Sequence, residues 1–146
     1  MESRIQIDAV APAAFRAMYA LEKYLQECQW TGTNKHLVKI RASQLNGCAF
    51  CIDMHTREAL KAGEIPKRIF LLDAWRETDV FSEEEKVILQ LTEEVTLIHQ
   101  KGVSTETYQR ALQILGEQYL AQLIMAVTTI NAWNRISIST NKPIGN

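Results

Sequence analysis

Cys48, Cys51 and His55 are the residues of this sequence whose types and spacing could carry out chemistry. They are separated by three and then four positions, a spacing that puts them on one face of an α-helix. Gly47 interrupts the preceding helical pattern, and residues 48–61 read as a new helix, so both sulfurs would lie in its first turn. The free N–H groups and the positive dipole end of a helix stabilise a thiolate there, and His55 adds a base one turn after Cys51.

Three interpretations of this pattern follow from the residues alone. In the first, thiol redox chemistry, one cysteine attacks as a thiolate, the other closes an intramolecular disulfide, and His55 takes or relays a proton. In the second, the three residues hold zinc in a non-enzymatic binding module, with His36 or Cys28 as fourth ligand. In the third, the cysteines are buried structural residues. The chain has no second C-x-x-C and no H-x-x-x-H pair, and a continuous helix makes a poor zinc knuckle, so redox chemistry is favoured.

Length and charge narrow the class of protein. The chain has 146 residues, with 16 basic and 17 acidic side chains and a formal net charge of -1. One domain is expected at this length, and neither nucleic acid nor an anionic membrane is implied as a partner. The first residues lack the charged start and apolar run of a secretory signal, so we expect a cytoplasmic protein. In that reducing compartment a C-x-x-C pair is more typical of catalysis or metal binding than of a structural crosslink.

Hydrophobic periodicity and capping signals predict an all-α domain of six to seven helices, without strands. Ser82 and Glu85 form a capping box at the start of one helix, and Gly116 separates the last two. The predicted helices cover residues 12–28, 35–46, 48–61, 83–101, 104–116 and 117–137, with a short apolar segment at 67–76.

Two of these helices carry predictions about burial. Cys28 falls on the apolar stripe of the helix over residues 12–28, so we expect it in the core. The middle of the last helix, residues 120–133, is apolar on nearly every side but is interrupted by polar residues and is too short to span a membrane. Such a helix must be central to the core or covered by another subunit, which favours a homo-oligomer.

The segment from Leu37 to Thr56, with the sequence LVKIRASQLNGCAFCIDMHT, resembles the AhpD-like alkyl hydroperoxidases of the carboxymuconolactone decarboxylase family. Shorter matches are LDAWRE at 72–77, FSEEEK at 81–86 and INAWNR at 130–135, so the resemblance spans about residues 33–139. It implies one AhpD-like helical domain over residues 1–146 that assembles as a homo-oligomer, commonly a trimer or hexamer.

The resemblance also implies a role for each site residue. Cys51 would attack peroxide and become a sulfenic acid, Cys48 would close the disulfide, and His55 would assist deprotonation of Cys51. Family members with a proton relay often carry Glu twelve residues before the first cysteine, where this chain has His36. A neutral imidazole accepts a proton but lacks a fixed negative charge, so the relay would be altered. Phe50 likewise replaces a polar residue that some members have between the cysteines.

The activity implied is that of a thiol-dependent peroxidase without a cofactor, an antioxidant oxidoreductase acting on a hydroperoxide. An external dithiol, from a lipoyl protein or a thioredoxin-like protein, would restore both thiols. The wider family also suggests a cofactorless lyase that decarboxylates a muconolactone acid, but such members do not rely on a C-x-x-C pair. The family name alone does not decide the substrate.

Overall fold

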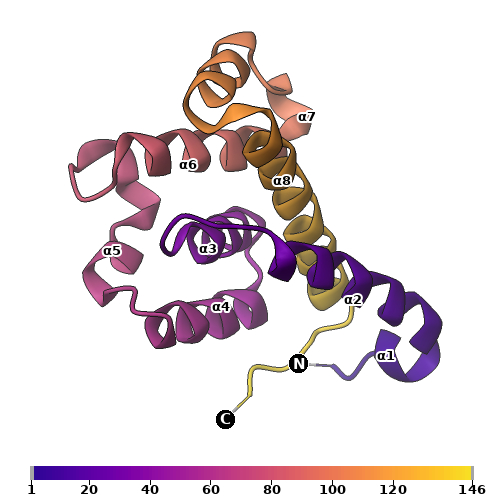
Figure 1. The fold of residues 1–146 in the computed structure, drawn as a ribbon. Coiled ribbons are helices and arrows are strands. Elements are labelled where there is room, and N and C mark those ends of the chain that lie inside the picture. Colours follow the sequence, from indigo (N-terminus) through magenta and orange to yellow (C-terminus); the bar gives the residue numbers. More distant parts are fainter. Residues whose placement is uncertain (1, 146) are drawn as a thin grey trace.

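The computed structural model describes residues 2–145, which fold as helices joined by turns (Figure 1). The all-α prediction is confirmed. The described residues contain more elements than the six to seven helices predicted, because several are short. The elements are α1 (Ile7–Val10), α2 (Pro12–Glu27), α3 (Asn34–Asn46), α4 (Ala49–Lys61), α5 (Pro66–Phe70), the 3-10 helix η1 (Leu72–Glu77), α6 (Glu83–Thr96), α7 (Ile98–Lys101) and α8 (Thr105–Ser139).

Helix α3 lies in the middle of the fold and packs on both sides. One face joins α6 and α8 in a hydrophobic cluster, and the other joins α4, η1 and α6 in a second cluster. Burial of apolar surface in these two clusters is the main force that holds α3 in place. The first cluster includes Leu25, Val38, Ile88, Leu91, Leu123 and Val127, and the second includes Leu37, Ile40, Leu72, Trp75, Phe81 and Leu89.

Helix α8 is interrupted where the sequence predicts a break. Gly116 has φ 78° and ψ 167°, a conformation that only glycine adopts at little cost, and regular helix continues on either side. The capping box at the start of α6 is also confirmed, since the Ser82 side chain accepts from the Glu85 N–H and the Glu85 side chain accepts from the Ser82 N–H. The central part of α8 is buried against α3 and α6, as its apolar composition predicts.

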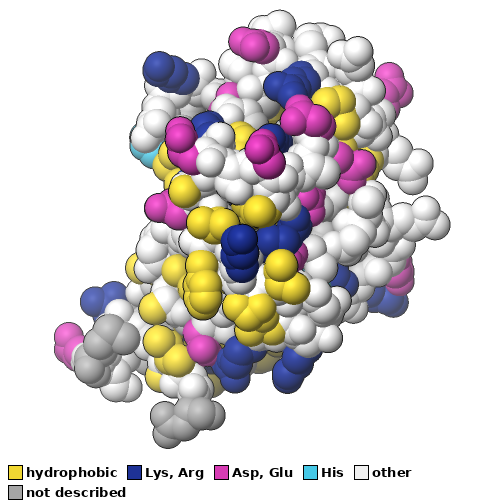
Figure 2. Space-filling model, turned by 90° about the vertical axis from the view of Figure 1, so that its left-hand side faces the viewer, with side chains coloured by type: hydrophobic (Ala, Val, Ile, Leu, Met, Phe, Trp, Pro, Cys, Tyr) yellow, Lys and Arg dark blue, Asp and Glu magenta, His cyan; other side chains and the backbone are white. Residues whose placement is uncertain are grey.

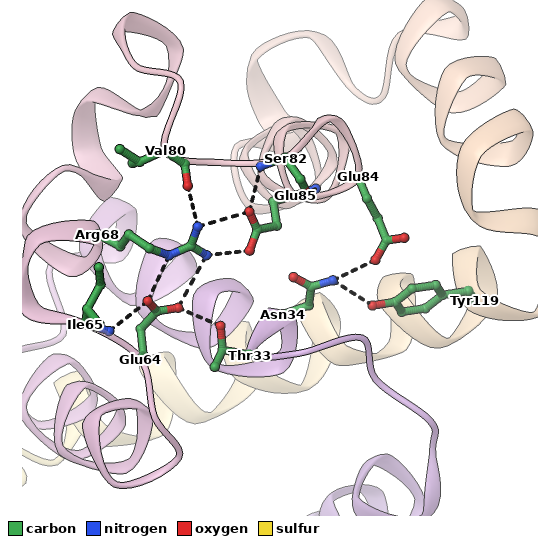
Figure 3. Close-up of polar contacts among 10 residues, drawn as sticks. All are labelled: Thr33, Asn34, Glu64, Ile65, Arg68, Val80, Ser82, Glu84, Glu85 and Tyr119. Carbon is green, nitrogen blue, oxygen red and sulfur yellow. Dashed lines mark hydrogen bonds and ion pairs between the residues drawn. The ribbon is translucent and has the colours of Figure 1, made fainter.

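A polar network ties the start of α3 to the end of α4 (Figure 3). Glu64, buried just after α4, accepts hydrogen bonds from Thr33 Oγ1 at 2.6 Å and from Arg68 Nε at 2.8 Å. Arg68 also pairs with Glu85 of α6. Burial acts to raise the pKa of Glu64, but these hydrogen bonds outweigh it and hold the pKa below its ordinary value. The carboxylate is therefore charged at neutral pH, and its contacts, with those of Arg68, link α3, α4, α5 and α6.

A second network of polar contacts involves residues of the LDAWRE segment at 72–77. Glu93 of α6 accepts hydrogen bonds from Arg41 Nε at 2.9 Å and Trp75 Nε1 at 2.8 Å, and it pairs with Arg76 at 2.7 Å. Arg41 in turn pairs with Asp73 at 2.6 Å. A buried carboxylate needs such partners. The motif residues therefore act in packing η1 against α3 and α6.

The prediction that Cys28 belongs to the core is wrong. Helix α2 ends at Glu27, and Cys28 has extended backbone angles that take it off the apolar stripe. It is half-buried, and its S–H donates to the Tyr24 carbonyl oxygen at 3.3 Å. Trp30 packs against the core beyond it and donates from Nε1 to the Leu25 carbonyl oxygen.

Hydrophobic side chains also gather on the surface, among Lys and Arg side chains, on the face shown in Figure 2. Helix α5 lies on this side of the molecule in Figure 1, and Phe70 at its end is 80% exposed. Within residues 2–145, no helix has the length and apolar character that crossing a bilayer requires. The predicted homo-oligomer would cover part of such a face, and it stays a prediction.

Candidate active site

The two motif cysteines lie at the junction of α3 and α4. Gly47 ends α3 in a left-handed conformation, with φ 69°, and lets the chain turn sharply into α4. Cys48 is the N-cap of α4, and its sulfur accepts from the Cys51 N–H at 3.4 Å. The predicted position of both sulfurs at the start of a helix is confirmed.

Cys48 and Cys51 form a disulfide with a Cα–Cα separation of 5.3 Å. Both side chains are buried, with 1% of each residue exposed. This separation lies in the range that a disulfide spans without backbone movement. Among residues 2–145, no group of three or more His, Cys, Asp or Glu side chains is placed to hold a metal ion.

An asparagine cluster fixes this junction to α8. Asn46, the last residue of α3, donates to Asn131 Oδ1 at 3.0 Å and to Asn134 Oδ1 at 2.8 Å. Asn134 is fully buried and donates to Ser43 Oγ at 3.0 Å. The INAWNR motif therefore supports the residues just before Cys48, a role that the sequence pattern alone did not reveal.

His55 lies one turn after Cys51 and is held by a carboxylate. It is 4% exposed, and its Nδ1 lies 2.8 Å from Glu58 Oε2. Burial lowers the pKa of His55 below its ordinary value, and Lys39 acts in the same direction, whereas the hydrogen bond to Glu58 raises it. The imidazole is therefore neutral at pH 7 and can accept a proton.

Glu58 is a site residue that the sequence reasoning missed. Burial acts to raise its pKa, but the hydrogen bond with His55 and the positive charge of Lys39 hold the pKa below its ordinary value. It is therefore ionised at neutral pH. A glutamate three residues after a histidine is common on helix surfaces, so only the burial of His55 distinguishes this pair.

A cavity of about 370 Å³ opens beside Cys51 and His55. Cys51 lines it, whereas Cys48 does not. Its walls come from α1, α2, α3, α4 and α8, and the hydrophobic residues that line it are Ile7, Phe15, Tyr19, Phe50, Met54, Trp133 and Ile136. A larger hollow of about 510 Å³ between α6 and α8 is lined by neither cysteine nor histidine.

An aromatic cluster and an ion pair form one wall of this cavity. The Phe15 ring meets Tyr19 and Trp133 edge-on, with centroids 5.2 and 5.1 Å apart. Glu22 accepts from Trp133 Nε1 at 2.9 Å and from Lys39 Nζ at 3.2 Å. Apolar rings therefore make up much of this wall, and the charges of Glu22 and Lys39 are paired with each other.

His36 does not line the cavity, although Glu58 and His55 are close enough for their charges to influence it. Its side chain is buried in α3, and its Nδ1 has no hydrogen-bond partner in the described part of the chain. Burial lowers the pKa of His36 below its ordinary value, and Lys35 and Lys39 lower it further. Cys48, Cys51 and His55 therefore lie close together on α4 and at its N-cap, whereas His36 lies on α3 and outside the cavity.

The protein is thus an all-helical thiol protein, with a pair of cysteines at the start of α4 and a cavity beside Cys51. Residues 11–94 match the carboxymuconolactone decarboxylase family, and the chain belongs to that family. The chain is 45% identical over 139 residues to the uncharacterized protein YdfG of Bacillus subtilis (strain 168), covering 95% of each protein.

Solved structures share the fold. A crystal structure of an Agrobacterium tumefaciens protein of unknown function, for which a role as the antioxidant defence protein AhpD has been proposed, matches with a TM-score of 0.95 and 33% identity. The match covers 99% of both chains. A cysteine-to-alanine variant of the debrominase Bmp8 in complex with 2,3,4-tribromopyrrole matches with a TM-score of 0.83 at 13% identity, covering 94% of this chain and 73% of that one. At that identity only the fold is shared, so function must be argued from the site.

Proposed function

We propose that this protein is a thiol-dependent peroxidase of the alkyl hydroperoxide reductase type. The Cys51 thiolate attacks the outer oxygen of a hydroperoxide and breaks the O–O bond, so the substrate leaves as an alcohol and Cys51 becomes a sulfenic acid. The Cys48 thiol then condenses with it, releasing water and forming the disulfide. The observation that carries this proposal is a cysteine pair that closes within one helical turn beside an open cavity.

The cavity supports the assignment of the two cysteines. Cys51 is the attacking residue because it lines the cavity through which a substrate would arrive. Cys48 caps the helix behind it and is placed to resolve the sulfenic acid. His55 lines the same cavity and takes the Cys51 proton, directly or through water. His36 lies outside the cavity, and its lowered pKa leaves it neutral at pH 7, so it is a weaker candidate for this proton transfer than His55.

The size and lining of the cavity favour an organic hydroperoxide over hydrogen peroxide. A volume of about 370 Å³ is far larger than hydrogen peroxide needs. Three aromatic rings on one wall would bury an apolar body while the peroxide group reaches Cys51. Substrate binding would then contribute to the rate through apolar burial next to the sulfur.

Re-reduction of the disulfide needs an external dithiol that reaches a buried bond. Cys48 and Cys51 are each 1% exposed, so the attacking thiol must enter through the cavity. A lipoyl group on a flexible arm is slender and apolar enough to do so, and a thioredoxin-like protein is the alternative reductant. We expect this exchange in the cytoplasm, where such dithiols are kept reduced.

Thiol titration of the reduced protein before and after addition of an organic hydroperoxide tests this function. Two of the three thiols should disappear, and mass spectrometry should locate one disulfide between Cys48 and Cys51, with Cys28 still free. Retention of all three thiols, or a disulfide that includes Cys28, would contradict the proposal. A cofactorless lyase would instead keep its activity in the double variant Cys48→Ser, Cys51→Ser.

A further inference from the structure

The proton acceptor of this site depends on a carboxylate from the same helix. We infer that Glu58 is a positioning residue that fixes His55 in the tautomer whose Nε2 is free to accept the Cys51 proton, a role that rests on the proposed function. His55 Nδ1 and Glu58 Oε2 lie 2.8 Å apart, with Glu58 one turn further along α4.

The tautomer follows from the donor and acceptor properties of the two groups. An ionised carboxylate can only accept a hydrogen bond, so the proton of neutral His55 must lie on Nδ1. The lone pair then lies on Nε2, the only ring atom left as a base. His36 has no such partner, since its buried Nδ1 lacks a hydrogen bond within residues 2–145. His55 is thus the histidine that a carboxylate prepares for proton transfer.

Glu58 also stabilises the imidazolium that forms when His55 takes the proton. Burial of His55 disfavours that cation, and a negative charge in contact with Nδ1 offsets the penalty. The Glu58 side chain is 47% exposed, which lets protons exchange between the site and water.

Other charged groups around His55 do not replace this contact. Lys39 of α3 is paired with Glu22 of α2 at 3.2 Å. The remaining ionisable groups around His55 and the cavity are His36 of α3, Asp8 of α1, Tyr19 of α2, Cys51 of α4 and Lys142 after α8. Glu58 is the carboxylate in hydrogen-bond contact with His55.

The test is the pH dependence of iodoacetamide alkylation of Cys51 in the fully reduced full-length protein, with mass spectrometry resolving the labelled cysteine. In Glu58→Gln the amide keeps the size of the side chain but not its charge. The midpoint of alkylation should move up by about one pH unit, and the rate at pH 7 should fall about tenfold. Glu58→Asp, which keeps the charge on a shorter side chain, should shift less than Glu58→Gln.

Asp53→Asn is the matched control, because it removes a carboxylate from the same helix that pairs with Arg57 and not with His55. Loss of that negative charge near the helix start should leave the midpoint in place or lower it. A purely structural role is tested in the His55→Ala background, where Glu58→Gln should no longer raise the midpoint.

An unchanged alkylation midpoint in Glu58→Gln would overturn the positioning role. An equal rise of the midpoint when Glu58→Gln is made in the His55→Ala background would also overturn it. No peroxide is used in this experiment, so its result is separate from that of the proposed function. A midpoint shift in a protein that fails to reduce peroxides would support the positioning of His55 and contradict the peroxidase activity alone.

Discussion

At the scale of single residues, the two cysteines differ in their surroundings. Both are buried in the same helical turn, yet only Cys51 lines the cavity shared with His55. Cys48 uses its sulfur as the N-cap of α4. The two thiols therefore differ in their access to the cavity, which His55 also lines.

The charge state of His55 gives a residue-scale prediction about pH. Burial lowers its pKa below the ordinary value of about 6.5, so it stays a free base at pH 7 and loses that capacity as pH falls through its lowered pKa. Peroxide reduction should therefore decline on the acid side at a pH below 6.5. In His55→Ala this acid-side decline should move to higher pH, because Cys51 must then ionise without a neighbouring base, and the rate at pH 7 should fall about 100-fold. The measurement is kcat/KM for an organic hydroperoxide against pH, and an unchanged profile would remove His55 from the mechanism.

At the scale of elements, the orientation of α3 against α4 positions the site. Hydrophobic clusters, the Asn46 contacts with α8 and the Glu64 network all act on this pair of helices. The Glu64 network (Figure 3) joins the start of α3 to the end of α4, and the cysteines lie at the opposite ends of these two helices. Its loss should therefore act on stability more than on the chemistry of the thiols.

Glu64→Gln should lower the free energy of unfolding at pH 7 by about 2 kcal/mol, because Arg68 and Thr33 lose a charged partner. Since the pKa of Glu64 is lowered by folding, its contribution is full above its unfolded pKa of about 4.5 and is lost as pH falls through the folded value. Urea unfolding at pH 7 and at pH 4 measures both effects, and the difference between variant and parent should shrink at pH 4.

Glu117→Gln serves as the control for that experiment. Glu117 is exposed on α8, and its side chain forms no hydrogen bond or ion pair with the other described residues. Its replacement should change stability by less than about 0.5 kcal/mol. An equal loss in both variants, or a loss in Glu64→Gln that does not depend on pH, would contradict the role given to the network.

Local signals were enough to predict most elements and the centre of the site. The capping box at Ser82, the break at Gly116 and the position of Cys48 and Cys51 at the start of α4 each depend on neighbours within a few positions. Cys28 was misassigned because the end of α2 falls one residue earlier than the apolar stripe suggests. Sequence periodicity does not resolve an error of that size.

Other features of the site depend on packing between distant segments. The pattern of α4 contains Glu58 but does not show that His55 beside it is buried. Position 36 is a histidine, and the carboxylate in contact with His55 is that of Glu58, a contact that the spacing of residues did not reveal. The aromatic wall joins Phe15 to Trp133, residues far apart in the chain.

At the scale of the whole molecule, the cavity is assembled from both ends of the chain. Helices α1 and α2 supply one wall and the end of α8 another, around the cysteine helix α4. The described residues near the two chain ends are also joined, since Gln6 Nε2 donates to the Thr140 carbonyl oxygen at 3.2 Å. In the proposed peroxidase, the outer segments of the chain would therefore select the substrate that reaches Cys51.

Phe15→Ala should weaken the preference for organic hydroperoxides. The ring contacts Tyr19 and Trp133, so its loss removes apolar contact area from the cavity wall. The ratio of kcat/KM for cumene hydroperoxide to that for hydrogen peroxide should fall about tenfold. Tyr24→Ala, on the same helix but away from the cavity, should leave the ratio unchanged. Equal ratios in the parent and Phe15→Ala would argue against a role for the aromatic wall in specificity.

The number of subunits is a further property of the whole molecule. The family resemblance implies a trimer or hexamer, and exposed hydrophobic side chains such as Phe70 are consistent with a covered face. Sedimentation equilibrium of the reduced and oxidised protein measures the mass directly. A monomer at all concentrations would contradict the predicted homo-oligomer.

The most direct test of the mechanism is trapping of the sulfenic acid with dimedone in single-cysteine variants. In Cys48→Ser, one equivalent of organic hydroperoxide should leave a trapped sulfenic acid at Cys51, because the resolving thiol is gone. In Cys51→Ser, peroxide consumption should fall to background and Cys48 should carry no adduct. Sulfenic acid formed at Cys48 in Cys51→Ser at the parent rate would contradict the account, since the attacking and resolving roles would then be reversed.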